Sequence, residues 1–178
     1  MPTQPCISVN SSRRIVALHS CVALALFLFP FVGNAQWKEV TPALPSYPRD
    51  ESLLLVKLPP RDTIKLYVDT DSIAIGEDGV ARLNLVIVGT KGARNVFFEG
   101  LRCATLEHKT YAYGTADHRM VAISRARWQE LPRYDVNNYL RLLHKTYVCD
   151  HTDAPRAKSE IVRRIKYDID GSVFDNKY

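Results

Sequence analysis

The side chain best placed to do chemistry is a carboxylate inside an apolar run. In a regular strand the side chain of Glu99 points to the same face as the apolar side chains of Phe97 and Leu101. A buried carboxylate needs a partner or a shifted pKa. Arg82 on the preceding strand is one candidate partner, and Arg102 is another if Gly100 marks a bulge. Glu99, Arg102 and Arg82 are therefore the candidate catalytic residues, with Glu99 as a general acid or ligand anchor. The favoured interpretation is a structural ion pair that fixes the strand register.

Other reactive side chains form no recognised constellation. His144 and His151 are two helical turns apart without a third ligand placed near them, so no metal site and no cofactor are predicted. The serines lack the Gly-x-Ser-x-Gly elbow. A run of carboxylates could suggest calcium, but its spacing does not match a calcium loop and Asx-turns explain it better. These carboxylates are Asp69, Asp71, Glu77 and Asp78.

Several aromatic residues could form a binding surface, as tyrosine and tryptophan often do at interfaces. Packing in the core and against the sheet is the preferred interpretation. The residues concerned are Tyr111, Tyr113, Trp128, Tyr134 and Tyr139.

The N-terminal segment has the layout of a secretion signal. Arg13 and Arg14 precede an apolar run that extends to Val32, and small residues follow at the end of that run. We expect cleavage between Ala35 and Gln36. A transmembrane anchor is the alternative, because the run is nearly long enough to span a bilayer, but no basic stop-transfer cluster follows it. The prediction is a periplasmic protein without a membrane anchor after cleavage.

The predicted cleavage decides which cysteines remain in the mature chain. Of the four cysteines, Cys6 and Cys21 belong to the signal, which leaves Cys103 and Cys149 in an oxidising compartment. We expect these two to form a disulfide that stabilises the fold by up to roughly 4 kcal/mol. A redox or metal-binding pair is the alternative, but the chain has no Cys-x-x-Cys and no close zinc-type spacing.

Charge gives little information about partners. Without residues 1–35 the chain keeps 22 basic and 19 acidic side chains, a net charge of +3. This small excess, spread over both signs, predicts no nucleic-acid binding. Another envelope protein or an anionic envelope surface remains a candidate partner.

The elements that must position these residues are mostly strands. Prolines between residues 36 and 62 predict an extended arm with one edge strand near Leu53–Leu58. From Ile64 to Ser124 short alternating runs separated by turns predict an antiparallel sheet of five to six strands. The chain should turn around Asp69–Ser72, and in the strand Val80–Val88 the apolar and polar side chains should separate onto two faces.

The last third is predicted to be helical. Apolar residues recur at steps of three and four from Val136 to Tyr147 and lead to Cys149, and Pro155 opens a second helix. In that helix Ile161 and Ile165 should be buried and Arg164 exposed, and the tail after Gly171 should fray. The fold class is α+β: a signal peptide at 1–35, the proline-rich arm at 36–62, and one domain at 63–178.

Four blocks of this sequence resemble the CNP-one-like family (cryptic neisserial protein), an exported proteobacterial domain. The blocks are Tyr67–Ile73, Glu77–Val80, Arg94–Cys103 and Tyr111–Gly114. The motif positions they carry are Asp69, Ser72, Asp78, Gly79, Asn95, Glu99, Gly100, Arg102, Tyr111 and Gly114. The resemblance implies a domain of the Gram-negative envelope and no mechanism.

Function is therefore predicted by what the sequence lacks. The chain carries no recognised catalytic constellation, which favours a non-enzymatic periplasmic binding or interaction module. The alternative is a small envelope hydrolase that uses Glu99 with Arg82 or Arg102.

Overall fold

Alternating apolar residues in the middle of the chain form an antiparallel sheet. The computed structural model describes residues 36–59, 62–132 and 139–169. Within them, seven strands pair in the order β1 to β6, and β7 pairs with β5. Their bounds are β1 Leu53–Val56, β2 Lys65–Ile75, β3 Val80–Val88, β4 Arg94–Arg102, β5 Glu107–Gly114, β6 Met120–Ala122 and β7 Gln129–Glu130. The predicted antiparallel sheet is confirmed, with a slightly higher strand count than expected.

The central strand β3 separates its side chains as its alternation predicts. Leu83 and Leu85 pack into the main core, and Arg82 and Asn84 lie on the opposite face. Because β3 pairs along its whole length with β4, this separation fixes which face each β4 side chain occupies.

Two helical segments follow the sheet. The first begins as α2 (Tyr139–Leu142) and continues as a π-helix, η5 (Leu143–Val148). The second is α3 (Lys158–Lys166), in which Ile161 and Ile165 are buried as predicted. Arg164 corrects the prediction of an exposed basic face: it is buried, and its Nε donates a hydrogen bond to the carbonyl of Thr146 at 2.9 Å.

The predicted turn at Asp69–Ser72 is instead part of a strand. β2 continues through these residues to Ile75, and its pairing with β3 shifts register between Asp69 and Ala74. The polar residues that suggested a turn lie at this irregularity. A bulge of this kind interrupts the ladder without ending the strand. Two short 3₁₀ turns, η3 (Asp50–Ser52) and η4 (Cys103–Thr105), lead into β1 and out of β4.

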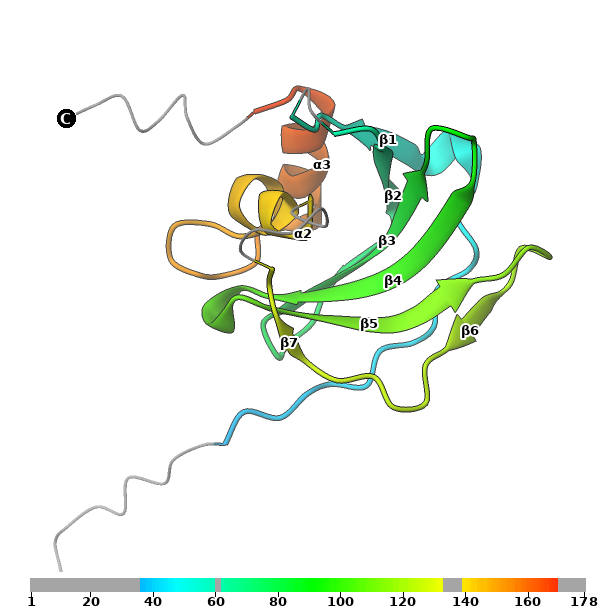
Figure 1. The fold of residues 1–178 in the computed structure, drawn as a ribbon. Helices are drawn as coiled ribbons and strands as arrows, with labels where there is room; N and C mark the ends of the chain where they lie inside the picture. Colours follow the sequence, from blue (N-terminus) through cyan, green and yellow to red (C-terminus); the bar gives the residue numbers. More distant parts are fainter. Residues whose placement is uncertain (1–35, 60–61, 133–138, 170–178) are drawn as a thin grey trace, which may run out of the picture. The chain divides into compact units, whose positions relative to one another are not determined.

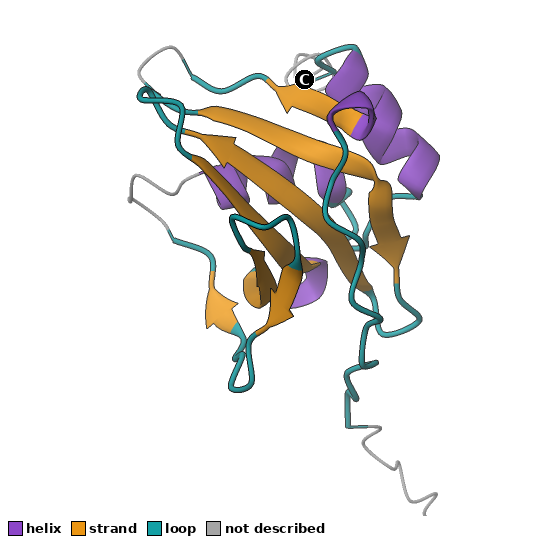
Figure 2. Cartoon of the chain, turned by 90° about the vertical axis from the view of Figure 1, so that its right-hand side faces the viewer, coloured by secondary structure: helices purple, strands orange, loops and turns teal. Residues whose placement is uncertain are grey.

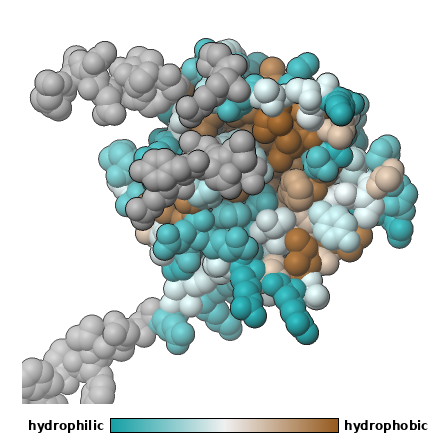
Figure 3. Space-filling view, viewed as in Figure 1, coloured by the Kyte–Doolittle hydropathy of each residue, from teal (hydrophilic) through white to brown (hydrophobic). Residues whose placement is uncertain are grey.

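The sheet is covered on its two faces by different parts of the chain. The helices lie on one face, and the extended segment before η3 runs across the other (Figures 1 and 2). Apolar side chains are visible along the seam between α3 and β2 (Figure 3). We call these the helix face and the arm face. The arm is the segment Lys38–Arg49, and it belongs to the compact unit that begins at Lys38.

Some expectations fall outside the described residues. These are the signal segment 1–35 with Ala35, the first turn of the predicted helix with Val136, Tyr134, and the tail after Gly171. In the part of the chain that is described, no helix is both long and apolar enough to cross a membrane.

Candidate functional site

Glu99 lies on the helix face, where the hairpin of β4 and β5 gives it two partners. Its side chain is 6% exposed, and β5 places Thr110 directly opposite. Thr110 Oγ1 donates a hydrogen bond to Glu99 Oε1 at 2.6 Å, and His108 Nδ1 lies 3.4 Å from Oε2. Tyr139 of α2 has its pKa raised to about 12 by burial and by the negative charge of Glu99. A buried carboxylate therefore sits beside an imidazole.

The two arginines expected beside Glu99 lie on the arm face instead. Arg82 is paired across the ladder with Gly100, the neighbour of Glu99, so its side chain leaves the sheet on the other side. Arg102, which alternates with Leu101, binds Glu107 at 3.2 Å. The bulge in this hairpin is at Tyr111 of β5, not at Gly100, so β4 keeps its alternation. Glu99 has its partners on β5 for this reason.

On the arm face, Arg82 and Asp78 form a buried ion pair that holds the arm. Their side chains are 4% and 0% exposed. Arg82 Nη1 bonds Asp78 Oδ1 at 3.0 Å, and Nη2 donates to the carbonyl of Val40 at 2.8 Å. The N–H of Val40 donates to Asp78 Oδ2 at 2.8 Å. Burial alone would raise the pKa of Asp78, but Arg82 and Val40 outweigh it and lower that pKa. The pair thus binds both backbone groups of one arm residue.

A second anchor lies one residue earlier in the arm. Glu39 accepts hydrogen bonds from Lys109 Nζ at 2.9 Å, Tyr111 Oη at 2.8 Å and Trp128 Nε1 at 3.2 Å. Burial works to raise the pKa of Glu39, yet these three donors lower it overall. Tyr111 has its own pKa raised by burial and by Glu39. Its ring covers Gly100, where an added Cβ would come within 2.6 Å of the ring, so only glycine fits there.

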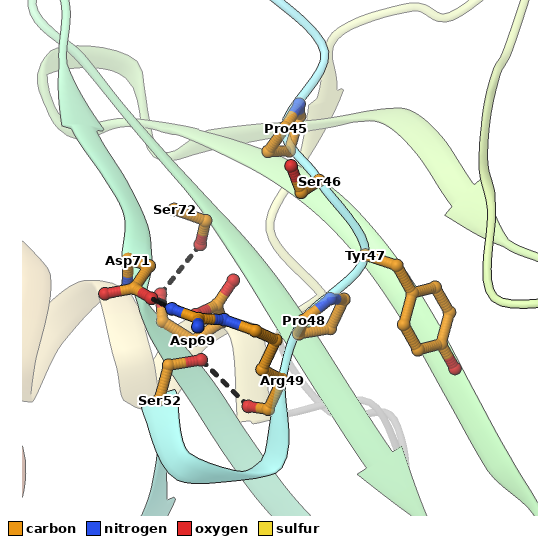
Figure 4. Close-up of a pocket in the computed structure, with 9 residues that line it drawn as sticks. All are labelled: Pro45, Ser46, Tyr47, Pro48, Arg49, Ser52, Asp69, Asp71 and Ser72. Atoms are coloured by element: carbon orange, nitrogen blue, oxygen red, sulfur yellow. Dashed lines mark hydrogen bonds and ion pairs between the residues drawn. The ribbon is translucent and has the colours of Figure 1, made fainter.

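Further along the arm, a groove opens between the arm and β2. Its volume is about 420 Å³, and its lining residues are Pro45, Ser46, Tyr47, Pro48, Arg49, Ser52, Asp69, Asp71 and Ser72. The side chain of Arg49 reaches across the groove to Asp71, with a distance of 2.8 Å between Nη2 and Oδ2 (Figure 4). Tyr47 points away from the groove in the same view and stacks on His118. Two carboxylates and one guanidinium therefore line one open groove.

Asp69 forms the deep wall of this groove. It is 3% exposed, and its carboxylate accepts hydrogen bonds from the N–H of Asp71 and from Asn84 Nδ2, both at 3.1 Å. Asn84 Nδ2 also donates to the carbonyl of Ser46, which ties the arm to β3. Of the carboxylates that could have suggested calcium, Asp78 binds Arg82 and Asp71 binds Arg49, so these two do not face a common site.

Cys103 and Cys149 form the predicted disulfide, with their Cα atoms 5.6 Å apart. It ties the end of β4 to the end of η5, so it holds the helices to the sheet. His144 lies beside it and is 3% exposed. Among the described residues, neither ring nitrogen of His144 has a hydrogen-bond partner of ordinary geometry. Burial lowers the pKa of His144, against an opposing effect of the Cys103 backbone.

The remaining motif positions lie in turns, in hydrogen bonds to the backbone, in packing contacts or on the surface. Gly79 has φ +72° in the turn before β3, a conformation that favours glycine. Ser72 Oγ accepts from the N–H of Asn84 at 2.7 Å and donates to the carbonyl of Asp69. Gly114 packs under the ring of Tyr47, and Asn95 is exposed. Of the aromatic residues, Tyr111 and Trp128 meet edge to face on the arm face, whereas Tyr113 is 43% exposed.

Several partners in these clusters are not evident from the sequence, and three residues show why. Glu39 is 70 positions from Lys109, so nothing local links them. His108 could have been found from the β4–β5 hairpin, because pairing Glu99 with Thr110 brings His108 near. The spacing of His144 suggests His151 as its partner, while its neighbours in space are Cys103 and Cys149.

Comparison with known proteins gives one result. A search of curated proteins and a search of solved structures both give no match. The model of the CNP1-like family, the family that the four sequence blocks resemble, matches residues 33–166. That match spans the arm, every strand, the disulfide and all of α3, so the chain belongs to the CNP1-like family.

Proposed function

We propose that this protein is a non-enzymatic binding module of the periplasm, and that its groove binds a cationic side chain of another envelope protein. The observation that carries the proposal is the groove between the arm and β2, in which Asp69 and Asp71 outnumber Arg49. The net negative charge of its lining favours a cationic group over an anionic surface.

The ion pair inside the groove supports exchange with a ligand. The side chains of Arg49 and Asp71 are 68% and 60% exposed, so their mutual attraction is screened by water and is weak. A guanidinium from a partner can replace Arg49 at Asp71 without opening the core, because both side chains of the pair are largely exposed. Arg49 then acts as an internal stand-in for the ligand.

A periplasmic location is consistent with the disulfide. Disulfides form and persist in oxidising compartments, and Cys103–Cys149 joins the sheet to the helices. The predicted signal at 1–35 would bring the chain to that compartment. The mass of the protein isolated from a periplasmic extract tests this point, because a chain that starts at Gln36 requires cleavage after Ala35.

The ligand proposal is tested by titrating the isotope-labelled protein with short peptides that differ only in a central Arg, Gln or Glu. We expect the Arg peptide alone to shift the amide signals of Asp71 and Ser72. In Asp71→Asn the affinity for the Arg peptide should fall about tenfold, because a charge-assisted hydrogen bond is lost.

A matched control uses a second exposed aspartate–arginine pair. Asp117 pairs with Arg119 outside the groove, in the turn between β5 and β6. Asp117→Asn should bind the Arg peptide as the unmodified protein does. Equal binding of the Arg and Gln peptides, or equal losses in both variants, would refute the groove as a cation site.

A second candidate function rests on Glu99 and His108. A buried carboxylate 3.4 Å from an imidazole could share a proton during hydrolysis, which is the acid–base pairing a small envelope hydrolase would need. Glu99→Gln should then abolish hydrolysis of a chromogenic ester or glycoside without lowering the unfolding midpoint. Hydrolysis that persists in this variant would exclude the enzyme.

A further inference from the structure

The strongest unexplained feature of the helix face is the buried imidazole of His144. Buried polar groups are normally hydrogen-bonded, and an exception needs a reason. Both ring nitrogens of His144 lack a hydrogen-bond partner of ordinary geometry among the described residues, although the residue is only 3% exposed.

The nearest soft ligands to this imidazole are the two sulfur atoms. One ring nitrogen of His144 and the Sγ atoms of Cys103 and Cys149 all lie within 4.8 Å of one another, and all three residues are buried. Among the described residues, no other group of three His, Cys, Asp or Glu side chains brings its metal-binding atoms this close together. Two thiolates and an imidazole are a donor set that zinc prefers.

The backbone brings His144 and Cys149 together by a local departure from the α-helix. In an α-helix with 3.6 residues per turn, two residues five positions apart point in different directions. In η5 the N–H of Cys149 instead donates to the carbonyl of His144 at 2.9 Å, which closes a wider turn. Such π-type turns occur frequently at functional sites.

We propose that reduction of the Cys103–Cys149 disulfide converts this cluster into a zinc site with Cys103, His144 and Cys149 as ligands. A dithiol reductant supplies two electrons and two protons, so the S–S bond breaks, two thiols form and the reductant becomes a disulfide. Zn²⁺ then displaces the two thiol protons, and a ring nitrogen of His144 donates its lone pair. Water fills the fourth position.

The oxidised and zinc-bound forms exclude each other, because each uses the same two sulfur atoms. The disulfide ties the sheet to η5 by a covalent bond, and the metal would join the same two segments by coordination. A reduced chain that holds zinc should therefore keep its helices on the sheet.

The test uses protein with Cys6→Ser and Cys21→Ser, so that Cys103 and Cys149 are the only cysteines. The protein is reduced without oxygen, freed of reductant and titrated with Co²⁺ and then Zn²⁺. We expect one Co²⁺ per chain, a thiolate-to-cobalt charge-transfer band, displacement by Zn²⁺, and a native mass of the chain plus zinc minus two hydrogens. The oxidised protein should show none of these signals.

Two histidine variants decide whether the imidazole takes part. His144→Gln should bind Co²⁺ at least about 100-fold more weakly, since a lost ligand costs more than a lost supporting contact. His151→Gln, an exposed histidine two residues after Cys149, should bind as the parent protein does.

Three results would overturn the proposal. The first is no thiolate-to-cobalt band in the reduced protein, and the second is equal affinity in the two histidine variants. The third concerns folding: a reduced chain whose amide spectrum is unfolded and is not restored by Zn²⁺ has no such site. The comparison of the histidine variants requires that oxidised His144→Gln shows a folded amide spectrum. If it does not, reduced Cys149→Ser replaces it and is compared with the reduced parent. Equal Co²⁺ affinity in those two proteins would then overturn the site.

Discussion

The two faces of the sheet are held by different forces. On the helix face, Leu83 and Leu85 pack among apolar side chains and a disulfide joins the layers. On the arm face, the cover is an extended segment held by Asp78, Arg82 and Glu39. An extended arm offers little apolar area, so its attachment depends on charged hydrogen bonds. The helix face should therefore respond most to redox state, and the arm face most to pH and to loss of single charges.

The largest expected effect is the loss of the ion pair on the arm face. Asp78→Asn leaves Arg82 buried without its counter-charge, and breaking a buried pair costs about 3–5 kcal/mol. We expect the urea midpoint to fall accordingly. Asp117→Asn, which removes an exposed charge pair, is the control and should leave the midpoint unchanged. Equal midpoints for both variants would show that the arm is not held by this pair.

The disulfide gives the next largest effect, on the helix face. Cys103→Ala combined with Cys149→Ala should lower the free energy of unfolding by about 2–4 kcal/mol, because the unfolded chain regains the freedom of a long loop. Urea unfolding measures this loss. Amide hydrogen exchange should increase in α2, η5 and α3 more than in the arm, and the reverse pattern would contradict the division between the faces.

Glu39→Gln should weaken the arm by a smaller amount. The amide keeps one acceptor but leaves the Lys109 ammonium without its counter-charge, for a cost of about 1–3 kcal/mol. Because Trp128 donates to Glu39, the tryptophan fluorescence should also change. Glu51→Gln removes the charge of an exposed carboxylate next to Arg49, and neither signal should move in that variant.

Acid should loosen the arm face through the same carboxylate. The pKa of Glu39 lies below its ordinary value of 4.5 in the folded protein, so its contribution is complete above that value. The contribution is lost as the pH falls through the lower folded pKa. Stability measured by urea from pH 6 downward should show this loss, and Glu39→Gln should flatten it. A slope that is unchanged in the variant would assign the acid loss to other groups.

The smallest effect should come from His144 on the helix face. Burial lowers the pKa of His144 from 6.5 in the folded protein. Just below pH 6.5, His144 is therefore protonated in the unfolded chain but still neutral in the folded protein. Stability should therefore fall as the pH drops below 6.5. His144→Gln should remove this step, while His151→Gln should keep it. An identical pH profile in both variants would show that His144 does not titrate in this way.

Much of the fold was predictable from local patterns. The alternation in Val80–Val88 predicted β3 and the two faces of the sheet, and the turn residues predicted its hairpin partners. The family resemblance and the pairing of Cys103 with Cys149 also followed from the sequence. These features depend on neighbours in the chain, or on the two cysteines that remain after the predicted signal, so they need no knowledge of the tertiary structure.

The clusters, by contrast, depend on contacts between distant segments. The sequence placed a carboxylate at Glu99, but the sheet decided that its partners are Thr110 and His108, because Arg82 leaves β3 on the other face. Only the path of the arm brought Glu39 to Lys109. A one-residue change of register moves a side chain to the opposite face of a sheet, so the alternation determined the faces while the tertiary structure alone decided which residues meet on them.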